Sequence, residues 1–116
     1  KAKDQISLTF ETRTTYVVAQ LERHLNTLAT ISGAAPMLGF LGTVIGMVLA
    51  FKEMAMSAGQ ADISQLAGGI YTALTTTVAG LVVGIISYIA YNQLVNVLQR
   101  ITQQFESMVN AVLEEL

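Results

Sequence analysis

The stretch GGIYTALTTTVAGLVVGIISYIAYN, residues 68–92, decides the fold of this chain. It contains no charged residue, and it is longer than the roughly 20 residues that a helix needs to cross about 30 Å of hydrocarbon. Three consecutive threonines, Thr75, Thr76 and Thr77, stand near its middle. A helix that faces only lipid needs no hydroxyl groups there, so the threonines indicate a partner helix, a file of water or an ion.

Two charge-free runs dominate the chain. The stretch above belongs to a run over residues 63–99, and a second run covers residues 25–51. Apolar residues make up 53% of the 116 residues and charged residues only 12%, about half the share that soluble domains carry. The sequence therefore predicts two membrane spans. The alternative is a soluble bundle with two buried helices, but the polar faces that such helices need are missing.

The charges around these runs predict an orientation. A polar break as short as residues 52–62 makes the two spans an antiparallel hairpin, with its turn at 57–64. Basic residues gather at the ends of the hairpin, and only Lys52 lies at the turn. The positive-inside rule then places both chain ends in the cytoplasm and the turn in the periplasm. The residues at the ends are Lys1, Lys3, Arg13, Arg23 and Arg100.

The flanking segments predict helices outside the bilayer. Residues 1–24 have an apolar face at helical spacing, although the β-branched threonines at 12, 14 and 15 weaken this prediction. The 37-residue run at 63–99 would measure about 55 Å as a helix, so the second span should continue beyond the membrane. The predicted fold is all-α: an integral membrane helical hairpin with spans at 25–56 and 65–93, and with long helices extending into the cytoplasm at 1–24 and 94–116.

Small residues form stripes along both spans. Such stripes let two helix backbones approach closely, and packing then holds the helices together. Pro36 predicts a kink, or a helix start, near residues 33–36 because it removes a backbone hydrogen bond. The predicted packing residues are Gly39, Gly42 and Gly46 in the first span, and Gly69, Ala73, Gly80 and Gly84 in the second.

The reactive side chains argue against an enzyme. The chain has no cysteine and one histidine, His24, which is predicted to be a surface or interface residue. No catalytic motif, cofactor motif or basic cluster for nucleic acid is present. The polar groups within the spans are hydroxyls and backbone carbonyls. A threonine hydroxyl either bonds the carbonyl four residues earlier in its own helix, bonds one helix to another for about 0.6–2 kcal/mol, or lines a path for water and ions. Because a hydroxyl does not change charge at physiological pH, an ion path would need a carboxylate from a partner helix.

Two segments carry a resemblance to a known family. APMLGFLGTVIGMVLAF (35–51) and GIYTALTTTVAGLVVGI (69–85, followed by Tyr91 and Asn92) resemble the second and third spans of the ExbB/TolQ/MotA family of proton-channel motor proteins. The likeness is greatest to the ExbB branch. It implies a further span before this sequence, a homopentamer in the bacterial inner membrane, and a pore that holds an ExbD-like single-span partner with a proton-binding Asp. A TonB-like protein would carry the work to the outer membrane.

The same resemblance assigns roles to the threonines. Thr43 and Thr77 fall on pore-facing threonines of the family, and Thr72 and Thr76 are further candidates for the ion path. Thr72 stands where family members often carry a Glu, which leaves proton transfer to the partner's Asp. The expected ion is H⁺, with Na⁺ as an alternative. The implied function is that of an ExbB-like subunit converting the proton motive force into work for outer-membrane transport. The alternatives are a TolQ-like subunit, a flagellar or gliding stator, or a passive membrane scaffold.

Overall fold

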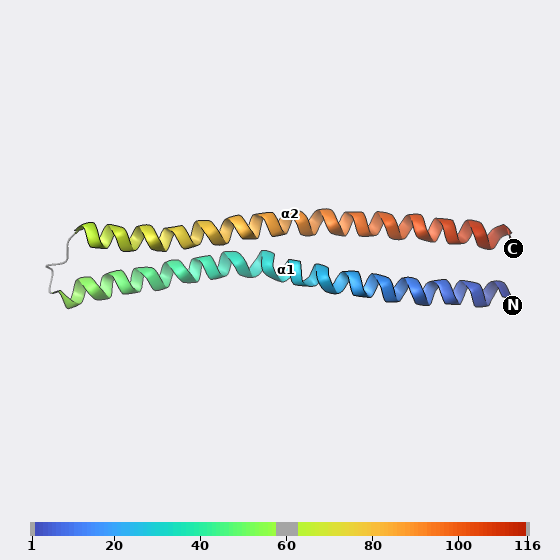
Figure 1. Cartoon of the computed structure of the whole chain (residues 1–116), viewed down its shortest axis with the longest axis horizontal. Helices are drawn as coiled ribbons and strands as arrows, with labels where there is room; N and C mark the ends of the chain where they lie inside the picture. The colour runs from blue at the N-terminus through green and yellow to red at the C-terminus, as the bar shows by residue number, and fades with distance from the viewer. Residues whose placement is uncertain (1, 58–62, 116) are drawn as a thin grey trace. The chain divides into compact units, whose positions relative to one another are not determined.

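Two long helices make up the part of the chain that the structure describes. The structure is a computed structural model, and it describes residues 2–57 and 63–115. Helix α1 spans Ala2–Met56 and helix α2 spans Ile63–Glu115 (Figure 1). The all-α fold predicted from the sequence is confirmed. Of the predicted turn at 57–64, residues 58–62 lie outside the described residues, and α1 closes with a bond of 3.1 Å from the Ser57 N–H to the Glu53 carbonyl.

The helices contribute to two compact units. The hairpin unit comprises residues 30–88, and the terminal unit comprises residues 1–29 with residues 89–116. The hairpin unit holds the central parts of both predicted spans, whereas the terminal unit holds most of the charged residues. Each unit is therefore described by itself.

Helix α1 is continuous through two places where the sequence suggested a weakness. The threonines near its start do not interrupt it, because the hydroxyls of Thr9 and Thr12 donate to carbonyls four residues earlier, at 2.9 Å each. These side chains bond within the helix rather than compete with it. The helix also passes through Pro36, so a helix start at residues 33–36 is not what the structure shows. The kink at Pro36 stays a prediction.

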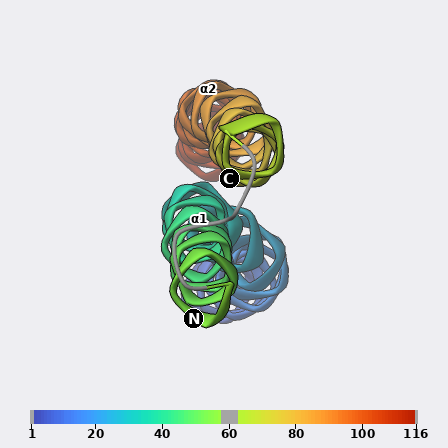
Figure 2. The same cartoon turned by 90° about the vertical axis from the view of Figure 1, so that its left-hand side faces the viewer.

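The hairpin unit is an antiparallel pair of helix segments in close contact. Figure 2 looks along the helices from the side where α1 ends and α2 begins. Its contacts run in opposite directions along the two helices: Gly39 meets Gly80, Gly46 meets Ala73, and Ala50 meets Gly69. These partners are spaced seven and four residues apart along each helix, which keeps them on one helix face. Ala73 is only 1% exposed and Gly39 is buried as well. The small-residue stripes are thus the surfaces by which the two segments meet.

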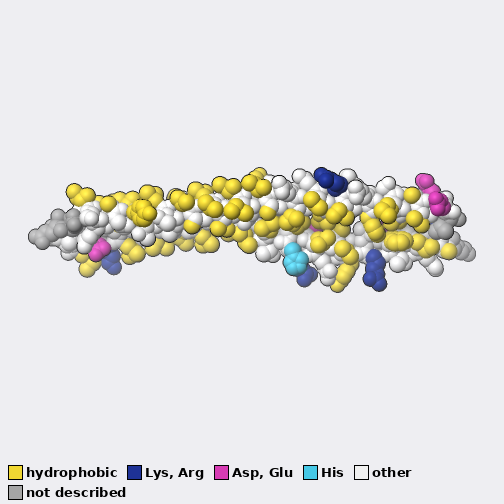
Figure 3. Space-filling view, turned by 45° about the horizontal axis from the view of Figure 1, so that its top comes forward, with side chains coloured by type: hydrophobic (Ala, Val, Ile, Leu, Met, Phe, Trp, Pro, Cys, Tyr) yellow, Lys and Arg dark blue, Asp and Glu magenta, His cyan; other side chains and the backbone are white. Residues whose placement is uncertain are grey.

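Large apolar side chains of the hairpin unit point away from this contact. Both helices are long and apolar enough to cross a membrane, and only 6% and 17% of their most apolar windows are buried within the structure. Figure 3 shows the resulting hydrophobic surface, which is nearly free of charge over this part of the chain. A core helix of a soluble bundle would bury these side chains, whereas hydrocarbon solvates them. The exposed side chains include Phe40, Val48, Leu81, Ile85 and Ile86.

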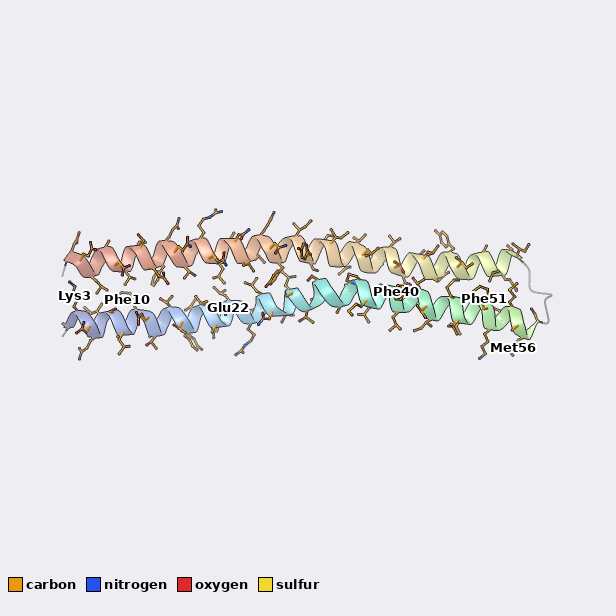
Figure 4. The ribbon with its side chains drawn as sticks, turned by 180° about the vertical axis from the view of Figure 1, so that it is seen from behind. Lys3, Phe10, Glu22, Phe40, Phe51 and Met56 are labelled. Carbon is orange, nitrogen blue, oxygen red and sulfur yellow. The ribbon has the colours of Figure 1, made fainter. Side chains whose placement is uncertain are left out.

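The terminal unit pairs the two ends of the chain. The rings of Phe10 and Phe105 meet edge to face with centroids 6.2 Å apart and an interplanar angle of 66° (Figure 4 labels Phe10). Next to Phe105 lies an apolar groove of about 200 Å³, and residues of both helices line it. The apolar face predicted for the N-terminal segment therefore lies against the C-terminal segment of the same chain. The apolar groove residues are Val17, Val18 and Leu21 from α1 and Leu98, Ile101 and Phe105 from α2.

Candidate functional site: a hydroxyl and carbonyl cluster between the helices

The centre of the hairpin unit brings Thr43 of α1 against Thr77 of α2. Their Oγ1 atoms are in direct contact, and either hydroxyl can donate to the other. Each hydroxyl also reaches across to the opposite backbone. Thr43 Oγ1 lies 2.9 Å from the Ala73 carbonyl oxygen, and Thr77 Oγ1 lies 3.2 Å from the Gly39 carbonyl oxygen. Both side chains are half-buried. The two threonines singled out by sequence thus form one hydrogen-bonded pair.

Thr76 joins this pair at its edge. Its Oγ1 lies 2.7 Å from the Ala73 carbonyl of its own helix and 3.3 Å from the Gly39 carbonyl of α1. Thr43 Oγ1 also lies 3.3 Å from the Gly39 carbonyl, four residues earlier in α1. We call these five groups the hydroxyl cluster: the three hydroxyls of Thr43, Thr76 and Thr77, and the carbonyls of Gly39 and Ala73.

The other two threonines of α2 in the hairpin unit, Thr72 and Thr75, do not join the cluster. The Thr72 hydroxyl donates to the Gly68 carbonyl at 3.0 Å, and the Thr75 hydroxyl donates to the Tyr71 carbonyl at 2.8 Å. Both residues are exposed in the structure. Thr72 precedes Thr77 by five residues, which turns it about 140° around the helix. Thr72 therefore lies apart from the hydroxyl cluster. That Thr72 lines an ion path stays a prediction.

Glycines make the cluster possible by keeping the backbones close. A Cβ placed on Gly39 would lie 2.8 Å from the Thr76 carbonyl oxygen and 3.1 Å from the Gly80 Cα. A Cβ on Gly42 would lie 2.6 Å from Thr76 Oγ1. These distances are shorter than van der Waals contact, so a side chain at either position would separate the helices. The glycines thus hold each hydroxyl within reach of the facing carbonyl.

Other small residues extend this contact toward Pro36. A Cβ on Gly84 would lie 2.5 Å from Pro36 Cγ, so the proline ring packs directly on the glycine. At Gly33 and Gly68, by contrast, an added Cβ would have nothing within 4 Å. The helix contact thus uses most of the glycines in the two apolar runs but leaves these two open.

The cluster contains no group that titrates near neutral pH. Among the described residues of the hairpin unit, the only Asp, Glu, Lys or Arg residues are Lys52 and Glu53, beside the turn. The described residues also hold no group of three or more His, Cys, Asp and Glu side chains that could bind a metal. Hydroxyls and carbonyls can order water or replace part of the hydration shell of a cation, but they cannot themselves store a proton.

Sequence reasoning did not identify the two carbonyls. Gly39 and Ala73 were predicted only as packing residues, yet their carbonyl oxygens accept most of the cluster's hydrogen bonds. The available signal was that a threonine hydroxyl in an α-helix often bonds a carbonyl three or four residues earlier. Gly39 lies four residues before Thr43, and Ala73 lies three residues before Thr76.

Comparison with known proteins identifies a family and several relatives that this chain resembles. The profile of the MotA/TolQ/ExbB proton channel family matches residues 1–107. An ExbB homolog of Methanothermobacter thermautotrophicus is 46% identical over 69 residues, which cover 60% of this chain and 24% of that protein. The biopolymer transport protein ExbB of Helicobacter pylori is 36% identical over 88 residues, covering 76% of this chain and 60% of the relative.

A TolQ protein is similar to a comparable degree. The Tol-Pal system protein TolQ of Haemophilus influenzae is 36% identical over 93 residues, covering 80% of this chain and 40% of that protein. The chain thus spans between about a quarter and three-fifths of the length of these relatives. The match over residues 1–107, in keeping with the two apolar helices, shows that this membrane protein belongs to the MotA/TolQ/ExbB proton channel family.

Proposed function

We propose that the chain is part of an ExbB-like subunit of an ion-driven motor in the bacterial inner membrane. Several copies, five by analogy with the family, form a ring around an ExbD-like single-span partner. Ion flow moves the partner, and a TonB-like protein transmits the work to the outer membrane. Both described ends of the chain lie in the cytoplasm, in keeping with the basic residues gathered there.

The hydroxyl cluster is the observation that carries this proposal. It places three hydroxyls and two carbonyls at one level of a unit that is otherwise apolar and nearly free of charge. Polar groups at this depth are costly in hydrocarbon, so their concentration at one point favours a use for them. The cluster offers donors and acceptors to a water chain or to a cation.

The proton itself requires an acid from another chain. No carboxylate lies within the described middle of the hairpin unit, and Thr72 occupies the place where the resemblance leads one to expect a Glu. An Asp on the partner helix supplies the missing titratable group. Thr43 and Thr77 then solvate the proton and relay it along their hydrogen bond, but they do not store the charge themselves.

Two other functions make different predictions. A passive scaffold would use the threonines only to bond the helices, and the bonds between Thr43 and Ala73 and between Thr77 and Gly39 are of that kind. A TolQ-like subunit would share the ion path but serve another partner, and the Haemophilus influenzae relative makes this the second candidate. Sodium is the alternative ion because hydroxyl and carbonyl oxygens also suit a dehydrated cation.

Flux through reconstituted membranes tests the proposal. The protein is placed in liposomes with and without an ExbD-type partner, and either a pH gradient or a Na⁺ gradient is imposed. We expect partner-dependent proton flux, reported by a pH-sensitive dye inside the liposomes. If the partner-dependent flux is of Na⁺ instead, the proposal of an ion-driven motor stands, with Na⁺ as its ion. Equal leakage with and without the partner, under both gradients, would support the scaffold.

A further inference from the structure

The hydroxyl cluster contains more donors than carbonyl positions. Each hydroxyl of Thr43, Thr76 and Thr77 has one proton to donate. The Gly39 and Ala73 carbonyls have two lone pairs each, and the helix N–H groups of Thr43 and Thr77 use one of each pair. Two carbonyl positions therefore remain for three hydroxyl protons. One hydroxyl must donate to another hydroxyl.

The distances allow three complete arrangements of these protons. When Thr76 donates to Ala73 at 2.7 Å, Thr77 can donate to Gly39 at 3.2 Å, and Thr43 donates to Thr77. When Thr76 donates to Gly39 at 3.3 Å instead, Thr43 can donate to Ala73 at 2.9 Å, and Thr77 donates to Thr43. In the third arrangement Thr76 again donates to Ala73, Thr43 donates to Gly39 at 3.3 Å, and Thr77 donates to Thr43. In all three arrangements both carbonyls are filled, Thr76 holds one of them, and Thr43 and Thr77 are bonded to each other.

We propose that Thr76 is a positioning residue that keeps Thr43 and Thr77 hydrogen-bonded to each other. Its hydroxyl occupies one of the two carbonyl positions, so only one of the other two hydroxyls can bind a carbonyl. Without the Thr76 hydroxyl, two donors would face two carbonyls. Thr43 would then bond to Ala73 and Thr77 to Gly39, and the bond between the two threonines would be lost.

The consequence of this role for transport rests on the proposed function. A proton that passes along a chain of hydroxyls reverses every hydrogen bond in it, and the bonds must turn back before the next proton arrives. Thr76 lets the bond between Thr43 and Thr77 reverse while both carbonyls stay bonded. The pair then remains connected in either direction.

The test removes only the Thr76 hydroxyl. In Thr76→Val the side-chain shape is kept, and Thr76→Ala removes the hydroxyl without adding a methyl group beside the Ala73 carbonyl. Thr75→Val is the matched control, because the neighbouring Thr75 hydroxyl bonds only within its own helix, to Tyr71. Thr76→Ser restores the hydroxyl. Proton-detected solid-state NMR of the protein in bilayers reports the hydroxyl protons of Thr43 and Thr77, and the liposome assay reports proton flux.

We expect the Thr43 and Thr77 hydroxyl signals to shift in Thr76→Val and Thr76→Ala, and to stay unchanged in Thr75→Val and Thr76→Ser. Loss of the shared bond should slow proton flux about tenfold, the effect of one net hydrogen bond on a rate. Unchanged hydroxyl signals in both Thr76 variants would overturn the inference. Shifted signals with no change in flux would uphold the positioning role and count against the proposed function.

Discussion

Replacing Thr77 with Val should abolish partner-dependent proton flux while leaving the helix hairpin assembled. Valine has nearly the shape of threonine, so the contact of α2 with Gly39 is retained. The variant loses the hydroxyl that touches Thr43 and lies 3.2 Å from the Gly39 carbonyl. Removal of one preorganised polar group beside a moving charge typically lowers rates by about 100-fold or more. The measurement is dye-reported proton flux in liposomes that contain the partner.

The neighbouring Thr75 provides the control for this variant. Thr75→Val makes the same chemical change on the same helix, but the Thr75 hydroxyl bonds only to the Tyr71 carbonyl of α2. It should keep the hydroxyl cluster intact. If Thr77→Val conducts as well as Thr75→Val, the threonine pair is not on the ion path. If Thr77→Val fails to assemble, the hydroxyl is needed mainly to join the helices.

Gly80→Ala should separate the helices of the hairpin unit. The added Cβ would lie 2.5 Å from the Ala35 carbonyl oxygen and 2.8 Å from the Gly39 Cα. Both neighbours are backbone atoms and cannot turn aside as a side chain would. Overpacking of this kind costs about 2 kcal/mol, and it also moves Gly39 away from Thr77. The measurement is the resistance of the hairpin to unfolding by SDS in mixed micelles.

Gly68→Ala is the matched control for this packing prediction. Gly68 lies on the same helix, and nothing stands within 4 Å of its Cβ position. The substitution there gains helix propensity, worth up to about 1 kcal/mol, without a clash. The hairpin should therefore become less stable in Gly80→Ala and equal or more stable in Gly68→Ala. Equal stability of the two variants would show that the close contact at Gly80 does not hold the helices together.

Much of the fold could be predicted from the sequence because its physical signals are local. Two charge-free runs separated by a short polar break dictate two apolar helices in a hairpin. The spacing of small residues identifies the face on which each helix meets the other. A helix start at Pro36 was a wrong alternative, because a proline can remain within a long helix when tertiary contacts support it, here the contact with Gly84.

The arrangement of the site could not be predicted because it depends on register. Sliding α2 by one turn against α1 would keep small residues facing one another, since the stripes repeat every three or four residues. It would, however, remove Thr77 from Thr43 and from the Gly39 carbonyl. Spacing alone therefore predicts the contact face but not which threonines meet, and it gives no sign that Thr76 shares both carbonyls with its neighbours.

Silver-ion block of a Thr77→Cys variant tests the central claim most directly. The chain has no cysteine of its own, so a single thiol can be introduced without background. Ag⁺ is a small monovalent cation that binds thiolates, and it should reach Thr77 if ions pass the hydroxyl cluster. Val78→Cys places the thiol on the exposed neighbouring position, away from the helix contact. Our account predicts that Ag⁺ stops the remaining partner-dependent flux in Thr77→Cys and leaves Val78→Cys unaffected. Equal insensitivity of both variants, in liposomes that still conduct, would contradict it.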